Sequence, residues 1–170
     1  SAQMCTSPQN IYVPRGGIEV GGRRISVDEL CDALAAAYRG VTADPRRAAS
    51  ILAAIQSPST LELIESMRAA GARHGTVVAD SAPYAHPEYP GARTATPLLL
   101  RVTPAARALY CEERFGPVGF VIETDDADAA LQAATSDVRA AGGITAFAYS
   151  TRDGFLAAAE SAYAAAGAQL

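Results

Sequence analysis

Two short and almost uninterrupted apolar runs limit what this chain can fold into. Residues 97–102 are PLLLRV, and residues 119–122 are GFVI. Runs of this length without polar alternation are typical of strands that are buried on both faces, as in a parallel sheet covered by helices. Strand-like and helix-like segments alternate through the second half of the chain. This order favours an α/β domain with a largely parallel sheet.

Capping and turn signals predict the elements around these runs. Ser26 and Glu29 form a capping box at the start of a helix that we expect to stop at Gly40. Ser57–Pro58 is expected to begin another helix, which Gly71 would end. The glycines of residues 16–22 indicate a turn-rich loop. Residues 144–149 alternate and predict a further strand.

Composition excludes several functional classes. Hydrophobic residues make up 49% of the 170 residues and charged residues 19%, which indicates a globular chain of about one domain. The net charge of -4 and the absence of a basic-aromatic patch argue against nucleic acid as a partner. No apolar stretch reaches the roughly 18 residues that a membrane span needs. An odd set of three widely spaced cysteines suits a reducing cytoplasm and has no metal-ligand spacing.

Residues 112–118, EERFGPV, carry the most distinctive local pattern. Gly116 permits unusual backbone shapes and Pro117 locks φ, so a rigid turn leads directly into the second apolar run. The turn would hold a carboxylate, Glu113, in a position suited to binding sugar hydroxyls. Phe115 would offer a flat face beside it. The simpler alternative is a polar turn before a core strand.

Cys5 is the second candidate. A lone cysteine is more often a buried hydrophobe than a reactive group. Here, however, Gln3-x-Cys5 precedes a short strand of the type Ile-Tyr-Val, and the EERFGPV pattern follows much later in the chain. These two motifs in this order resemble the aldehyde dehydrogenase superfamily. The resemblance implies a three-layer α/β catalytic domain over residues 1–170, with Cys5 as the nucleophile, Glu113 holding the nicotinamide ribose and Phe115 against the nicotinamide.

The resemblance also implies a reaction and its partners. In such enzymes a cysteine thiolate attacks a small-molecule aldehyde to give a thiohemiacetal, hydride passes to NAD or NADP, and water releases the acid from a thioester. A thiol suits this role because it is nucleophilic once deprotonated. The backbone N–H of Cys5 and a side-chain amide would stabilise the oxyanion. The family further implies a homo-oligomer.

Two segments resemble a narrower branch of the superfamily. Residues 6–14 and 89–100 are similar to the PaaN-type aldehyde dehydrogenases of phenylacetate degradation. The chain departs from the family pattern because it contains no Gly-rich nucleotide loop, no general-base Glu and no oxyanion Asn. We expect these groups before Ser1 and an oligomerisation segment after Leu170. The chain would then be a catalytic fragment that is inactive alone.

Two alternatives remain open from the sequence. The chain could be a non-catalytic α/β module that binds a partner or a small ligand, or Cys5 could serve a thiol acyl-transfer or esterase centre. His74 and His86 could each act as a general base, but neither has a partner at a readable spacing, so solvated histidines are the simpler interpretation. A nucleotide-binding domain encoded just upstream would favour the dehydrogenase.

Overall fold

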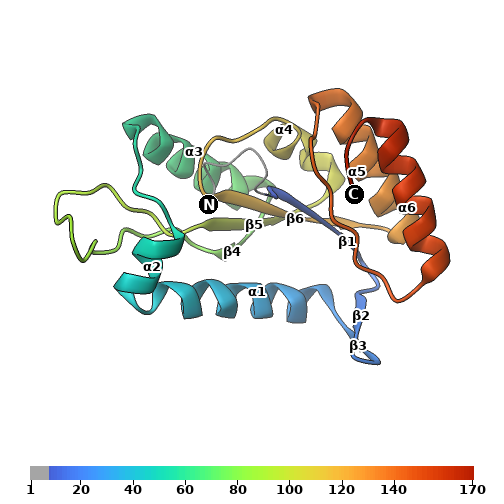
Figure 1. Cartoon of the computed structure of the whole chain (residues 1–170), viewed down its shortest axis with the longest axis horizontal. Coiled ribbons are helices and arrows are strands. Elements are labelled where there is room, and N and C mark those ends of the chain that lie inside the picture. The colour runs from blue at the N-terminus through green and yellow to red at the C-terminus, as the bar shows by residue number, and fades with distance from the viewer. Residues whose placement is uncertain (1–7) are drawn as a thin grey trace.

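A four-stranded sheet lies at the centre of the computed structural model, which describes residues 8–170 (Figure 1). The strand order is β1-β6-β5-β4. The strands are β1 (Asn10–Pro14), β6 (Val118–Thr124), β5 (Leu98–Val102) and β4 (Gly75–Ala79). β1 pairs in parallel with β6, and β6 with β5, whereas β4 is antiparallel to β5. The expected α/β fold with a largely parallel sheet is therefore confirmed.

Helices cover both faces of this sheet. One face carries α1 (Val27–Thr42) with α2 (Pro45–Ile51) at its end. The opposite face carries α3 (Pro58–His74), the short η1 (Pro104–Ala106) and α4 (Arg107–Tyr110), and then α5 (Ala127–Ala141) and α6 (Asp153–Ala166) beside β1. Among residues 8–170, none of these helices combines the length and apolar character that a bilayer crossing requires.

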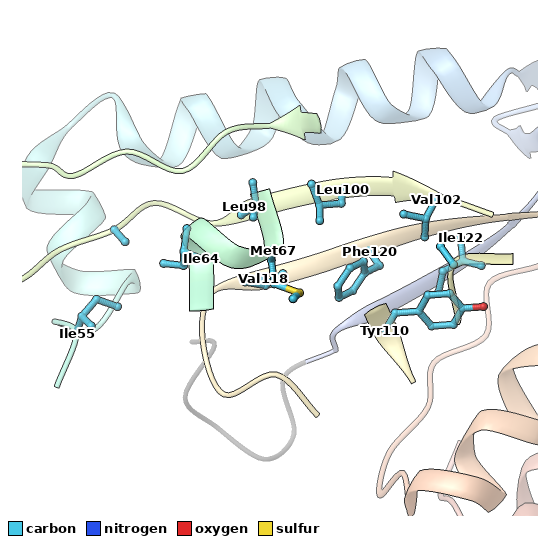
Figure 2. Close-up of a cluster of buried hydrophobic side chains, with 12 residues drawn as sticks. Ile55, Ile64, Met67, Leu98, Leu100, Val102, Tyr110, Val118, Phe120 and Ile122 are labelled. Carbon is cyan, nitrogen blue, oxygen red and sulfur yellow. The ribbon is translucent and has the colours of Figure 1, made fainter. Parts of the chain in front are cut away.

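The alternation of side chains along β5 and β6 builds a core on each face. Residues 98, 100 and 102 of β5 and residues 118, 120 and 122 of β6 pack toward α3 and α4 (Figure 2). Leu99 and Val121 point the other way and pack against α1. Phe120 is fully buried at the centre of the first cluster. The apolar runs are continuous because both of their faces are covered.

Two helices end later than the glycine signals predict. The capping box of Ser26 and Glu29 forms as expected, but α1 continues through Gly40. α3 continues past Gly71, which is buried against β5. A Cβ at Gly71 would lie 2.5 Å from a methyl carbon of Leu100, so this glycine serves close helix–sheet packing. The helix instead ends at Gly75, where a Cβ would lie 2.1 Å from the carbonyl oxygen of Arg101.

The glycines of residues 16–22 form more than a loop. They frame an antiparallel hairpin of β2 (Ile18–Val20) and β3 (Arg23–Ile25). Val20 pairs with Arg23, which leaves a two-residue turn with φ of 58° and 77°. Positive φ at both positions is what tight hairpin turns require, and glycine adopts it without steric cost.

The strand predicted over residues 144–149 is wrong. This segment makes one isolated parallel bridge, between Thr145 and Gln169, rather than a ladder. Its alternation nevertheless has a structural meaning, because Ala146 and Ala148 pack against the α5–α6 cluster. Tyr149 on the other side is 90% exposed. Within the described part of the chain no neighbouring strand lies beside this segment to complete a sheet.

Candidate active site

The parallel pairing of β1 and β6 places the amino ends of these two strands at one edge of the sheet. Asn10 lies opposite Phe120, so the amino ends of the two strands are adjacent. The chain enters β1 from the segment that contains Cys5, and it enters β6 from the EERFGPV loop. Cys5 itself lies outside the described residues. Glu113 and Phe115 lie within them, on the loop before β6.

Two tight turns shape the loop over residues 111–117, the entry loop. The N–H of Gly116 donates to the carbonyl of Arg114 at 2.8 Å, and the N–H of Val118 donates to the carbonyl of Gly116 at 2.8 Å. Each bond spans three residues and closes a γ-turn, and the fixed φ of Pro117 suits the second one. Gly116 is buried against α3.

The entry loop directs its two candidate side chains outward. Phe115 is 62% exposed, although it is a large aromatic residue next to a buried strand. Glu113 is also exposed. The loop therefore presents a carboxylate and a ring face at the amino edge of the sheet.

Gln9 connects the start of β1 to the entry loop. Its side-chain oxygen accepts a hydrogen bond from the N–H of Arg114 at 2.7 Å. Its Nε2 donates to the carbonyls of Glu112 and Tyr110 at 3.1 and 3.2 Å. The Nδ2 of Asn10 donates to the carbonyl of Tyr110 at 3.0 Å. Neither sequence motif singles out this pair, whose signal in the sequence is two adjacent amides at the start of a short strand.

A buried carboxylate on α5 also joins β1 to the start of α4, the helix that leads into the entry loop. Asp137 is 7% exposed and accepts hydrogen bonds from the hydroxyl of Tyr12 and from Nε of Arg107, both at 2.6 Å. These partners lie on β1 and at the start of α4. Burial and the hydrogen bond to Asp137 raise the pKa of Tyr12, and burial raises the pKa of Tyr110 to about 12. Both phenols are therefore neutral at physiological pH, and Tyr12 is a donor.

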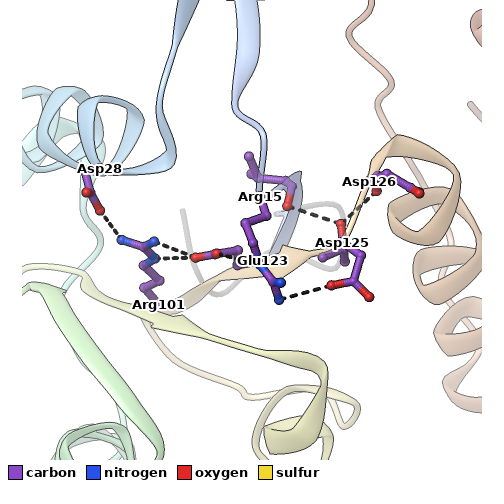
Figure 3. A network of polar contacts seen from close by, with 8 residues as sticks. Arg15, Asp28, Arg101, Glu123, Asp125 and Asp126 are labelled. Carbon is purple, nitrogen blue, oxygen red and sulfur yellow. Dashed lines mark hydrogen bonds and ion pairs between the residues drawn. The ribbon is translucent and has the colours of Figure 1, made fainter.

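The opposite edge of the sheet is occupied by a network of ion pairs (Figure 3). The guanidinium of Arg101 contacts both Glu123 and Asp28. Arg15 contacts Glu123 at 3.4 Å and Asp125 at 3.0 Å. Ligands of open α/β sheets usually bind at this carboxyl edge. Here the two guanidinium groups are paired with three carboxylates, whereas the exposed carboxylate and ring of the entry loop lie at the amino edge.

The other two cysteines differ in their surroundings. Cys31 is buried between α1 and the sheet, and burial raises the pKa of its thiol. A buried thiol of this kind is a poor nucleophile because the thiolate is the reactive form. Cys111 is half-buried in the entry loop and forms no disulfide.

The histidines and carboxylates of the described residues do not assemble a metal centre. His74 is exposed at the end of α3. Nδ1 of His86 accepts hydrogen bonds from the backbone N–H groups of residues 88 and 89 at 3.2 Å each, which gives this side chain a structural role in its loop. Over residues 8–170, no group of three or more His, Cys, Asp or Glu side chains could hold a metal ion.

Comparisons with known proteins give matches in sequence and in fold. Residues 1–160 match the model of the aldehyde dehydrogenase family. The fold superposes on the crystal structure of an NAD-dependent aldehyde dehydrogenase from Burkholderia multivorans with a TM-score of 0.94 and 40% identity. It also matches the fold of an NAD-dependent benzaldehyde dehydrogenase from Corynebacterium glutamicum, with a TM-score of 0.62 and 18% identity. A comparison with curated proteins gives no match.

The chain is much shorter than these solved structures. The match to the Burkholderia protein covers 100% of this chain and 30% of that one. The match to the Corynebacterium protein covers 94% of this chain and 31% of that one.

Proposed function

Because the chain belongs to the aldehyde dehydrogenase family, we propose that it is the nucleophile-bearing catalytic portion of a longer NAD(P)-dependent aldehyde dehydrogenase. The observation that carries the proposal is the parallel pairing of β1 and β6. This pairing puts the start of β1, which follows Cys5 by five residues in the sequence, beside the start of β6, which follows the loop that contains Glu113. A nucleophile and a cofactor-binding carboxylate must lie near each other for such a reaction.

In this proposal Cys5 forms the covalent bond to the substrate. The thiolate attacks the carbonyl carbon of the aldehyde, a C–S bond forms, and the carbonyl electron pair moves to oxygen to give a thiohemiacetal after protonation. Loss of hydride from that carbon, together with loss of the hydroxyl proton to water, leaves a thioester. Attack by water breaks the C–S bond, releases the carboxylic acid and returns the thiol.

The entry loop fits the nicotinamide end of the cofactor. Bound NAD(P)+ would be the oxidant and would accept the hydride. The two oxygens of Glu113 can accept hydrogen bonds from two neighbouring ribose hydroxyls, and its side chain is exposed and free to do so. The exposed ring of Phe115 offers an apolar face for the nicotinamide. The description of the Burkholderia relative favours NAD+.

The substrate class follows from the narrower resemblance. Residues 6–14 and 89–100 are similar in sequence to PaaN-type enzymes of phenylacetate degradation. We therefore propose an aldehyde formed during degradation of an aromatic compound. The test is formation of reduced cofactor, followed by absorbance, when the complete enzyme is mixed with NAD+ or NADP+ and a panel of aliphatic and aromatic aldehydes. Hydrolysis of an ester without any aldehyde oxidation would instead favour a thiol esterase centre.

The 170-residue chain by itself is expected to oxidise no aldehyde. Its sequence has no Gly-rich loop to bind the cofactor phosphates, so binding energy for the cofactor would come from the entry loop alone. The check is calorimetric titration of the chain with NAD+ and NADP+, together with the absorbance assay. Tight stoichiometric binding would show that a nucleotide site exists within these residues.

Glu113→Gln in the complete enzyme is expected to weaken the positioning of the cofactor. Hydrogen bonds to a charged group contribute about 1.5–3 kcal/mol, so cofactor affinity or the rate of hydride transfer should fall roughly tenfold or more. Glu112→Gln is the matched control, because Glu112 is an exposed neighbour that faces Arg114 at 3.4 Å. Cofactor titration and single-turnover absorbance measure both effects. Equal behaviour of the two variants would remove the assigned role of Glu113.

A further inference from the structure

Gln9 holds the backbone on both sides of Glu113. The carbonyl of Glu112 belongs to the peptide group before Glu113, and the N–H of Arg114 belongs to the peptide group after it. The carboxamide of Gln9 donates to the first at 3.1 Å and accepts from the second at 2.7 Å. Both peptide planes attached to the Cα of Glu113 are therefore bonded to one side chain. Their orientation determines the direction in which the Glu113 carboxylate leaves the backbone.

The position of Gln9 is itself fixed by the sheet. Its backbone carbonyl accepts a hydrogen bond from the N–H of Phe120 at 2.8 Å, next to the first register pair of β1 and β6. Asn10 adds a bond from its side chain to the carbonyl of Tyr110 at 3.0 Å. The Gln9 carboxamide uses its oxygen as an acceptor and its nitrogen as a donor, so a rotation about its last bond would break bonds at both ends.

Cys5 precedes Gln9 by four residues, which span at most about 14 Å when fully extended. Gln9 thus directly precedes β1, the strand that follows the nucleophile, and is bonded by its backbone to β6 and by its side chain to the entry loop. Resting on the function proposed above, we propose that Gln9 is a positioning residue that aligns the Glu113 carboxylate with the nucleophile segment. Small misplacements of reacting groups slow a reaction greatly, which gives such an alignment a measurable effect.

Two substitutions separate this role from general support of the fold. Gln9→Met keeps the length and volume of the side chain and removes all of its hydrogen bonds. Gln9→Glu keeps an acceptor for the N–H of Arg114 but, when ionised, loses the donor and adds a charge beside residues 112 and 113. A protonated carboxyl group has both a donor and an acceptor, so it restores the two-ended pattern. Gln132→Met is the control, because Gln132 is exposed on α5.

The experiment uses the complete enzyme and three readouts, with circular dichroism to verify the fold of each variant. For Gln9→Met we expect alkylation of Cys5 by iodoacetamide without cofactor to stay within about twofold of wild type, while NAD(P)+ affinity and single-turnover hydride transfer together fall about tenfold or more. Gln9→Glu should resemble Gln9→Met at pH 8 and recover relative to wild type as the pH falls toward about 5.5, since only the protonated carboxyl group can donate to the carbonyls of Tyr110 and Glu112. Gln9→Met should not recover, and Gln132→Met should match wild type throughout.

Two results would contradict the role of Gln9, and a third would remove the function on which that role rests. If Gln9→Met keeps both cofactor affinity and hydride transfer within about twofold of wild type, the alignment role is wrong. Equal slowing of Cys5 alkylation and hydride transfer would also overturn it, because it would assign Gln9 to support of the whole edge. Wild-type enzyme that oxidises no aldehyde would remove the proposed function, and this inference with it, before any variant is compared.

Discussion

Cys5→Ala in the complete enzyme is expected to lower the rate of formation of reduced cofactor by about three orders of magnitude or more. Alanine has no group that can attack the aldehyde, so neither the thiohemiacetal nor the thioester can form. Removal of the nucleophile should leave cofactor binding near wild type, because the cofactor contacts are assigned to Glu113 and Phe115. The measurements are steady-state absorbance with an oxidisable aldehyde and titration with the cofactor alone.

The chain offers two internal controls for this substitution. Cys31→Ala and Cys111→Ala should each retain activity within about twofold, since neither thiol is assigned a chemical role. Cys31 is 6% exposed, so its replacement should lower stability modestly, by about 1 kcal/mol. Turnover retained by Cys5→Ala, or lost equally in all three variants, would contradict the assignment of Cys5.

Phe120→Ala is expected to lower the free energy of unfolding by about 3–5 kcal/mol, which is the usual cost of truncating a buried Phe. The ring of Phe120 is 0% exposed, and its centroid lies 6.1 Å from that of Tyr110. Its loss leaves a cavity between β6 and α3 at the centre of the larger core cluster. Denaturant-induced unfolding followed by circular dichroism gives the value. A decrease of this size is a large share of the free energy of unfolding of an ordinary domain. Phe120→Leu therefore serves as a second variant, which should lower the free energy of unfolding by less.

Phe115→Ala is the matched control, because it makes the same chemical change five positions earlier in the chain. The Phe115 ring is 62% exposed, so its removal should change stability by no more than about 0.5 kcal/mol. In the complete enzyme the same variant should weaken cofactor binding. A stability loss equal to that of Phe120→Ala would mean that the Phe115 ring is buried, and the entry loop would then not present it to a ligand.

Most of the local structure was predictable because it depends on neighbours in the sequence. The apolar runs at residues 97–102 and 119–122 became β5 and β6, since only strands covered on both faces bury such runs fully. The capping box at Ser26 formed because its bonds join residues three apart. Gly71 was misinterpreted because its contact, the Leu100 side chain, is distant in sequence and invisible to a local rule. The segment at residues 144–149 shows the same limit, since alternation records burial on one side but not the presence of a partner strand.

The candidate site was likewise predictable in part from the sequence. The residue types and order of the two motifs were sufficient to indicate the family and to single out Cys5, Glu113 and Phe115, because such chemistry requires particular side chains in a particular order. Only the tertiary structure decided that β1 pairs with β6, a strand that follows it by about a hundred residues, and that β4 runs antiparallel at the far edge. It alone brought the Gln9 carboxamide to the peptide groups around Glu113, and the Asp137 carboxylate to Tyr12 and Arg107. These bonds join residues more than 25 positions apart, and their free energy depends on burial and alignment that exist only once the sheet and its helices have packed.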